Sequence, residues 1–76
     1  MSYTMLPYRR SHLAVAAIER GAALLGITGA EMYRRLRAQN LVHKLLFDGY
    51  DALHTQSYDY VAETTVEALR NWEEGR

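Results

Sequence analysis

The stretch formed by residues 41–53 restricts the fold more than any other part of this 76-residue chain. Its apolar side chains would cover more than half the circumference of a helix, and such a helix is expected to be buried. Gly49 inside the stretch favours close backbone packing. The apolar residues are Leu41, Val42, Leu45, Leu46, Phe47, Tyr50 and Leu53. We therefore expect a central helix that other helices contact from two sides.

A first helix is predicted before this central one. Pro7 suits the first turn of a helix, because its missing N–H has no partner there. Gly26 is a C-terminal stop, and Gly21 marks a close approach to another helix. Residues 1–6 show no helical period and are expected to form a flexible arm. The inward positions are Val15, Ile18, Ala22 and Leu25, at spacings of three and four.

Capping signals predict two more helices. Thr28 and Glu31 form a capping box at the start of a helix over residues 29–38, and Asn40 ends it in a left-handed conformation. Ser57 is the N-cap of a last helix, with Asp59 in its first turn. Met32, Tyr33 and Leu36 are the inward residues of the earlier helix. The last helix is expected to bury Tyr58, Val61, Ala62, Thr65, Leu69 and Trp72. The prediction is one all-α domain over residues 1–76, a compact bundle of about four short helices.

Charge is unevenly distributed, although the formal net charge is zero. Residues 1–44 carry seven basic and two acidic residues, whereas residues 45–76 carry two basic and seven acidic ones. Halves of +5 and −5 favour ion pairs between packed helices, or two faces of opposite sign that meet a partner. The chain has no Cys, no signal-like segment and no apolar run of membrane-spanning length. We expect a cytoplasmic protein without a cofactor or a bound metal.

Aromatic and acidic residues in the second half are candidates for binding a partner protein. Tyr58 and Tyr60 are of the type enriched at binding hot spots, and Glu63 and Glu67 belong to the acidic last helix. The alternative is that Tyr58 and Trp72 belong to the core. A homodimer is a further alternative.

Two other groups of residues have a functional alternative of their own. Arg34, Arg35 and Arg37 would contact DNA if the second and third helices formed a helix-turn-helix, but the chain lacks the basic excess of such proteins. Asp51 and His54 share a helical face and would orient a general base or contribute metal ligands. Zinc needs three or four ligands, and a His near a helix C-terminus is more often a cap. We expect neither nucleic-acid binding nor enzyme activity.

The segment Tyr50-Asp51-Ala52-Leu53-His54-Thr55 resembles a motif of a family of short bacterial domains of unknown function. The resemblance extends over about residues 12–70. It includes the helix start Thr28-Gly29-Ala30-Glu31-Met32-Tyr33 and the acidic helix 60–69. Asn40 stands where the family usually has Gly, and both residues suit a left-handed turn.

The resemblance implies a function that the residues alone do not. Members of this family are often encoded beside ADP-ribosyltransferase-like proteins in toxin–antitoxin-like operons. The implied function is a non-enzymatic interaction module that binds a protein encoded nearby, in an antitoxin-like role. No catalytic residue carries over from the family. A small DNA-binding or autoregulatory domain that uses Arg34, Arg35 and Arg37 is the alternative.

Overall fold

The computed structural model describes the backbone of residues 2–75 and the side chains of residues 10–75. No strand occurs in this part of the chain, which confirms the all-helical prediction. The helices are, in order, α1 (Ser2–Leu25), α2 (Gly29–Ala38), the π-helix η1 (Val42–Phe47), α3 (Tyr50–Leu53) and α4 (Tyr58–Glu74).

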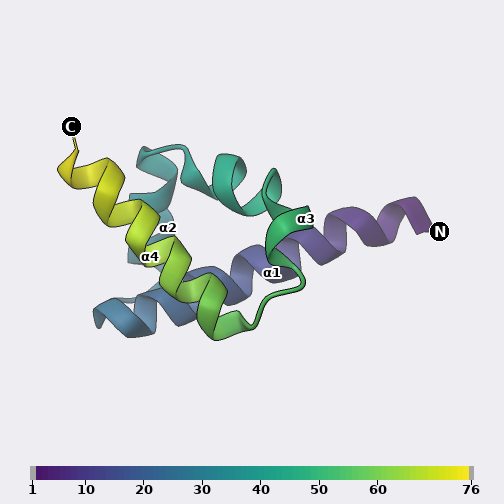
Figure 1. Ribbon diagram of the computed structural model, residues 1–76, viewed down its shortest axis with the longest axis horizontal. Coiled ribbons are helices and arrows are strands. Elements are labelled where there is room, and N and C mark those ends of the chain that lie inside the picture. The colour runs from purple at the N-terminus through teal and green to yellow at the C-terminus, as the bar shows by residue number, and fades with distance from the viewer. Residues whose placement is uncertain (1, 76) are drawn as a thin grey trace.

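The other helices pack around α1 and not, as expected, around residues 41–53. α1 contacts α4, α2 and η1, and its contact with α4 is the most extensive (Figure 1). With 24 residues it is the longest helix of the described chain. The helix begins at Ser2, so it includes Pro7 instead of starting there, and residues 2–6 of the predicted arm are helical. Residue 1 lies outside the described residues.

Residues 41–53 do not form the single helix that was predicted. The Asp48 N–H donates to the His43 carbonyl five residues earlier, at 2.9 Å, in the π-helical pattern. The Gly49 N–H then donates to the Leu45 carbonyl at 3.1 Å. A Cβ on Gly49 would overlap that same carbonyl oxygen, so only glycine fits here without a shift of the backbone. The chain therefore breaks at residues 48–49, and α3 starts in a new direction.

The predicted helix ends are confirmed. Thr28 Oγ1 accepts the Glu31 N–H, and Ser57 Oγ accepts the Tyr60 N–H, each at 3.1 Å. Gly26 and Asn40 have φ values of 70° and 60°, the left-handed conformation that ends a helix. One detail of the capping box is wrong, because the Glu31 carboxylate pairs with Arg34 instead of the cap.

The core lies where α1, α2 and α4 meet. Gly21 allows this approach, since a Cβ there would lie 2.9 Å from Met32 Cε and 3.5 Å from Val66 Cγ2. Four residues expected on inward helix faces are exposed: Val15 at 58%, Tyr33 at 43%, Tyr58 at 38% and Trp72 at 36%. Leu13, Ala14 and Ala17 are buried, so the buried face of α1 does not include Val15. The buried cluster comprises Leu13, Ala14, Ala17, Ile18, Ala22, Met32, Leu36, Leu41, Leu46, Leu53, Val61, Val66 and Leu69.

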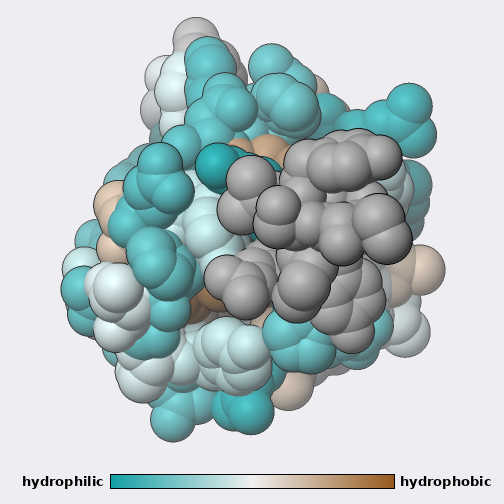
Figure 2. All heavy atoms as spheres, turned by 90° about the vertical axis from the view of Figure 1, so that its right-hand side faces the viewer, coloured by the Kyte–Doolittle hydropathy of each residue, from teal (hydrophilic) through white to brown (hydrophobic). Residues whose placement is uncertain are grey.

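Hydrophilic side chains predominate on the face shown in Figure 2, outside the atoms drawn in grey. Apolar atoms appear there only as small patches. No single helix among the described residues is long and apolar enough to cross a membrane. α1 and α2, bent by 106° between them, reach the required length and composition only as a pair.

Candidate partner-binding groove

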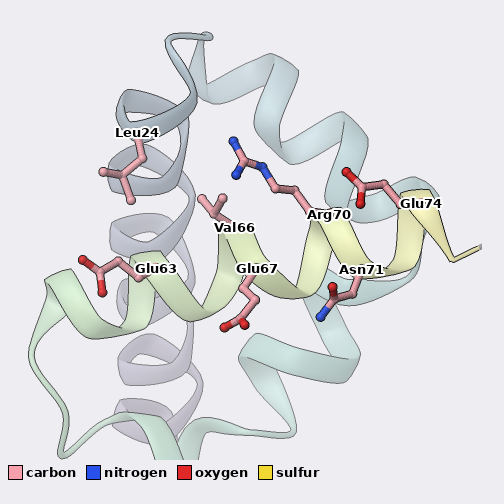
Figure 3. Close-up of a pocket in the computed structure, with 7 residues that line it drawn as sticks. All are labelled: Leu24, Glu63, Val66, Glu67, Arg70, Asn71 and Glu74. Atoms are coloured by element: carbon pink, nitrogen blue, oxygen red, sulfur yellow. The ribbon is translucent and has the colours of Figure 1, made fainter.

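An open groove of about 400 Å³ runs along the outer side of α4. α4 contributes all but one of its lining residues, and Leu24 in the last turn of α1 contributes the other (Figure 3). The lining residues are Leu24, Glu63, Val66, Glu67, Arg70, Asn71 and Glu74.

Helical spacing explains why these side chains of α4 share one surface. Glu63, Glu67, Arg70 and Glu74 follow one another at intervals of four, three and four residues, which places them on one side of a helix. The opposite side is buried against α1 through Val61, Ala62, Thr65 and Leu69. The Ser57 cap fixes where α4 begins, and the buried stripe fixes which way it faces.

Ion pairs within the chain account for five of the nine acidic residues, all of which lie in the described part of the structure. Three of these pairs join the two halves of opposite charge: Arg10–Asp51 at 3.9 Å, Arg20–Asp59 at 3.3 Å and Arg35–Glu73 at 2.6 Å. The other two, Arg34–Glu31 and His43–Asp48, are local. Pairing between packed helices was one reading of the split charge, and these contacts confirm it.

The acidic residues without such a pair are concentrated in the groove. Among the described side chains, no cationic group forms an ion pair with Glu63, Glu67 or Glu74, and all three are exposed. The Glu67 and Arg70 side chains diverge in Figure 3, which agrees with the lack of an ion pair between them. Glu19, on α1, is the fourth acidic residue that forms no ion pair with the described side chains. The groove is thus a surface of net charge −2 beside an exposed leucine.

Glu73 lies between groove residues in sequence but points toward α2. Its two carboxylate oxygens accept hydrogen bonds from Arg35 Nε and Nη2 at 3.0 and 2.6 Å. These hydrogen bonds lower the pKa of Glu73, against the smaller opposing effect of burial, and they raise the pKa of Arg35. Glu73 therefore links α4 to α2 and takes no part in the groove.

The four residues predicted to bind a partner are divided by the structure. Glu63 and Glu67 line the groove, and Tyr60, seven residues before Glu67 and 51% exposed, lies on the same side of α4. Tyr58 is only 38% exposed and lies on the α1 side, with the Arg20 guanidinium 5.3 Å from its ring centre. Five lining residues were not predicted as site residues: Leu24, Val66, Arg70, Asn71 and Glu74. Arg70 and Glu74 repeat the helical spacing of Glu63 and Glu67, a signal that could have found them. The part of Leu24 in the groove depends on how α1 crosses α4.

The family motif has structural contacts instead of an active-site geometry. Arg10 of α1 donates to the Phe47 carbonyl at 2.6 Å, lies 5.0 Å from the Tyr50 ring centre and pairs with Asp51. The His54 ring stacks on Tyr50, at 4.7 Å between ring centres. Its Nδ1 lies 3.0 Å from the Tyr50 carbonyl, which can only accept, so Nδ1 is the donor.

Of the other motif residues, Leu53 is buried and Thr55 is exposed. Asp51 interacts with Arg10 and not with His54, so the pair proposed as base or metal ligands is not assembled. No cluster of three metal-ligating side chains occurs in the described residues.

The three arginines considered for DNA binding do not form one free basic surface. Arg35 is held by Glu73 and Arg34 by Glu31. Arg37 is exposed and, with Tyr33, Arg34 and Ala38, lines a second open hollow of about 490 Å³. One of the three side chains is thus turned inward between helices, and two remain on the outer side of α2.

The fold and the groove define a small all-helical domain with an acidic outer helix face. Its sequence matches the family described as "Protein of unknown function (DUF3791)" over residues 12–72. That match covers most of the chain, so the chain belongs to this family, as the resemblance predicted. No curated protein and no solved structure matches it.

Proposed function

We propose that this chain is a non-enzymatic protein-interaction module that binds a partner through the groove on α4. The observation that carries the proposal is the distribution of acidic groups. Five of the nine acidic residues form ion pairs within the chain, whereas Glu63, Glu67 and Glu74 have none among the described side chains and lie on one helix face beside exposed Leu24. Protein partners are often recognised by a surface that combines unpaired charge with an accessible apolar side chain.

We further propose that the partner is encoded nearby, is ADP-ribosyltransferase-like, and is neutralised in an antitoxin-like manner in the cytoplasm. This part of the proposal rests on the family resemblance at residues 50–55. An interaction role is consistent with the structural contacts of His54 and Asp51. A small domain buries a modest share of its surface, so a partner would also stabilise it.

Co-expression of the full chain with the product of the adjacent gene, followed by pull-down, tests the proposal. We expect a complex that Leu24→Arg weakens and Val15→Arg leaves intact. These two aliphatic residues of α1 are equally exposed, at 57% and 58%, but only Leu24 lines the groove. Failure to recover any complex with the unsubstituted chain would exclude the proposed function.

A further inference from the structure

We infer that the segment of the partner that occupies the groove is a basic helix with one apolar anchor residue. This inference rests on the proposed function and adds the chemistry of the occupant. An amphipathic helix lying in a groove between helices is a common mode of peptide recognition. The groove determines which helix it accepts through its charge, its spacing and its apolar floor.

Charge requires that the occupant be basic. Glu63, Glu67 and Glu74 outnumber the single cation of the groove, Arg70. Lysine or arginine on the partner would pair with these carboxylates without breaking an ion pair, because no cationic group among the described side chains forms one with them. An acidic or phosphorylated occupant would face like charges at three positions and is disfavoured.

Spacing favours a helix as the form of the occupant. Glu63, Glu67 and Glu74 lie at i, i+4 and i+11, about 6 and 16 Å along the helix axis. A second helix lying alongside α4 and parallel to it repeats the same rise per residue in the same order. Lysines at i, i+4 and i+11 would therefore reach all three carboxylates in one register.

The apolar part of the groove requires an anchor residue. Leu24 is 57% exposed, and Val66 forms the floor beside it (Figure 3). An aliphatic side chain placed between the lysines would cover both. The aliphatic stems of the lysines themselves would extend the covered surface, because only their ends need water or a carboxylate.

A second copy of this chain is the competing occupant. Its α2 helix carries Arg34 and Arg37 beside exposed Tyr33, which is a short basic helix face. Arg34, however, already pairs with Glu31, and the face offers only two cations for three carboxylates. A partner with free lysines matches the groove better, and self-association becomes an outcome that the experiment must detect.

The test uses the full chain, labelled for NMR, and an alanine-based helical peptide with lysines at i, i+4 and i+11 and one leucine between them. Two control peptides replace the lysines with glutamate or the leucine with serine. We expect the lysine peptide to shift the amide signals of Leu24 and residues 63–74, and the shifts to fade at about 0.5 M salt. The glutamate peptide should shift none of these signals, and the serine peptide should bind more weakly.

Matched variants locate the interaction. Glu63→Gln with Glu67→Gln should weaken peptide binding about three- to tenfold, a range given by typical exposed ion pairs. Glu19→Gln removes an unpaired carboxylate of α1 outside the groove and should leave binding unchanged. Circular dichroism of each variant shows whether the fold is retained.

Three results would overturn the inference: no shifts with the lysine peptide at millimolar concentration, equal shifts with the glutamate peptide, or self-association that Arg34→Gln with Arg37→Gln abolishes. None of these three results depends on the outcome of the pull-down. A complex with the adjacent gene product that forms without any peptide binding would remove the basic helix and keep the proposed function. Peptide binding without such a complex would keep the basic helix as occupant of the groove and remove the proposed function.

Discussion

Single side chains explain why the Tyr50–Thr55 motif is compatible with a purely structural role. Tyr50 lies between the Arg10 guanidinium and the His54 ring, and its carbonyl accepts the His54 Nδ1–H. Arg10 also donates to the carbonyl of Phe47, just before the chain breaks at Gly49. These contacts attach α3 and the end of η1 to α1, which a helix of four residues needs.

At this scale, Glu73→Gln should lower the free energy of unfolding by about 0.5–1 kcal/mol at pH 7. The pKa of Glu73 is lower in the folded chain than in the unfolded one, so its contribution is complete above the ordinary carboxyl pKa. It is lost as the pH falls through the lowered folded-state pKa. Urea unfolding at pH 7 and at about pH 3 should show a difference between variant and parent that shrinks at the lower pH.

Glu74→Gln is the matched control for this measurement. Glu74 is the next residue, is exposed, and has no ion pair among the described side chains. It should change stability little at either pH. Equal effects of the two substitutions would show that the Arg35–Glu73 contact contributes nothing specific.

Among the elements, those with local signals were predictable from the sequence. Thr28, Ser57, Gly26 and Asn40 each act through a few neighbouring atoms, and the helix ends they mark appear as expected. The division of residues 41–53 was not predictable, because the apolar pattern continues through Gly49. The break falls directly after the π-helical turn, at a glycine whose added Cβ would overlap the Leu45 carbonyl oxygen.

Gly49→Ala should therefore lower the free energy of unfolding by about 1–3 kcal/mol, since its Cβ would meet backbone that has no room to move away. Gly21→Ala is the comparison. Its Cβ would meet the end of the flexible Met32 side chain, and the gain of about 1 kcal/mol in helix propensity opposes that strain. Urea unfolding of both variants should give a large effect at Gly49 and a small one at Gly21. The reverse order would contradict the proposed cause of the break.

In the molecule as a whole, oppositely charged residues of the two halves form ion pairs that join α1 or α2 to the later elements. The sequence predicted this complementarity but not the partners, because ion pairs 38 or more residues apart depend on how the helices cross. The same limit applies to the groove. Glu63 and Glu67 were selected from composition, whereas Leu24 joined them only through the packing of α1 on α4.

A double-mutant cycle on Arg20 and Asp59 measures one such contact between the halves. Arg20→Gln and Asp59→Asn should each destabilise the fold, and the double variant should lose less than the sum by about 0.3–1 kcal/mol. The cycle cancels the separate effect of Asp59 on the start of α4, which both backgrounds share. The coupling should vanish at about 1 M salt, because both side chains are exposed. A coupling that salt does not change would rule out an electrostatic origin.

The overall charge also predicts the behaviour toward DNA. Duplex from the region upstream of the gene should give no shifted band in a gel assay, even at about 0.05 M salt, since binding needs several cations at the phosphates. Arg34 and Arg35 are engaged by Glu31 and Glu73, and only Arg37 of the three has no ion pair among the described residues. Glu73→Gln releases Arg35 but raises the net charge only to +1, so it should not produce a shift either. A low-salt complex that disappears in Arg34→Ala with Arg37→Ala would restore the DNA-binding alternative, because those two side chains share the outer side of α2.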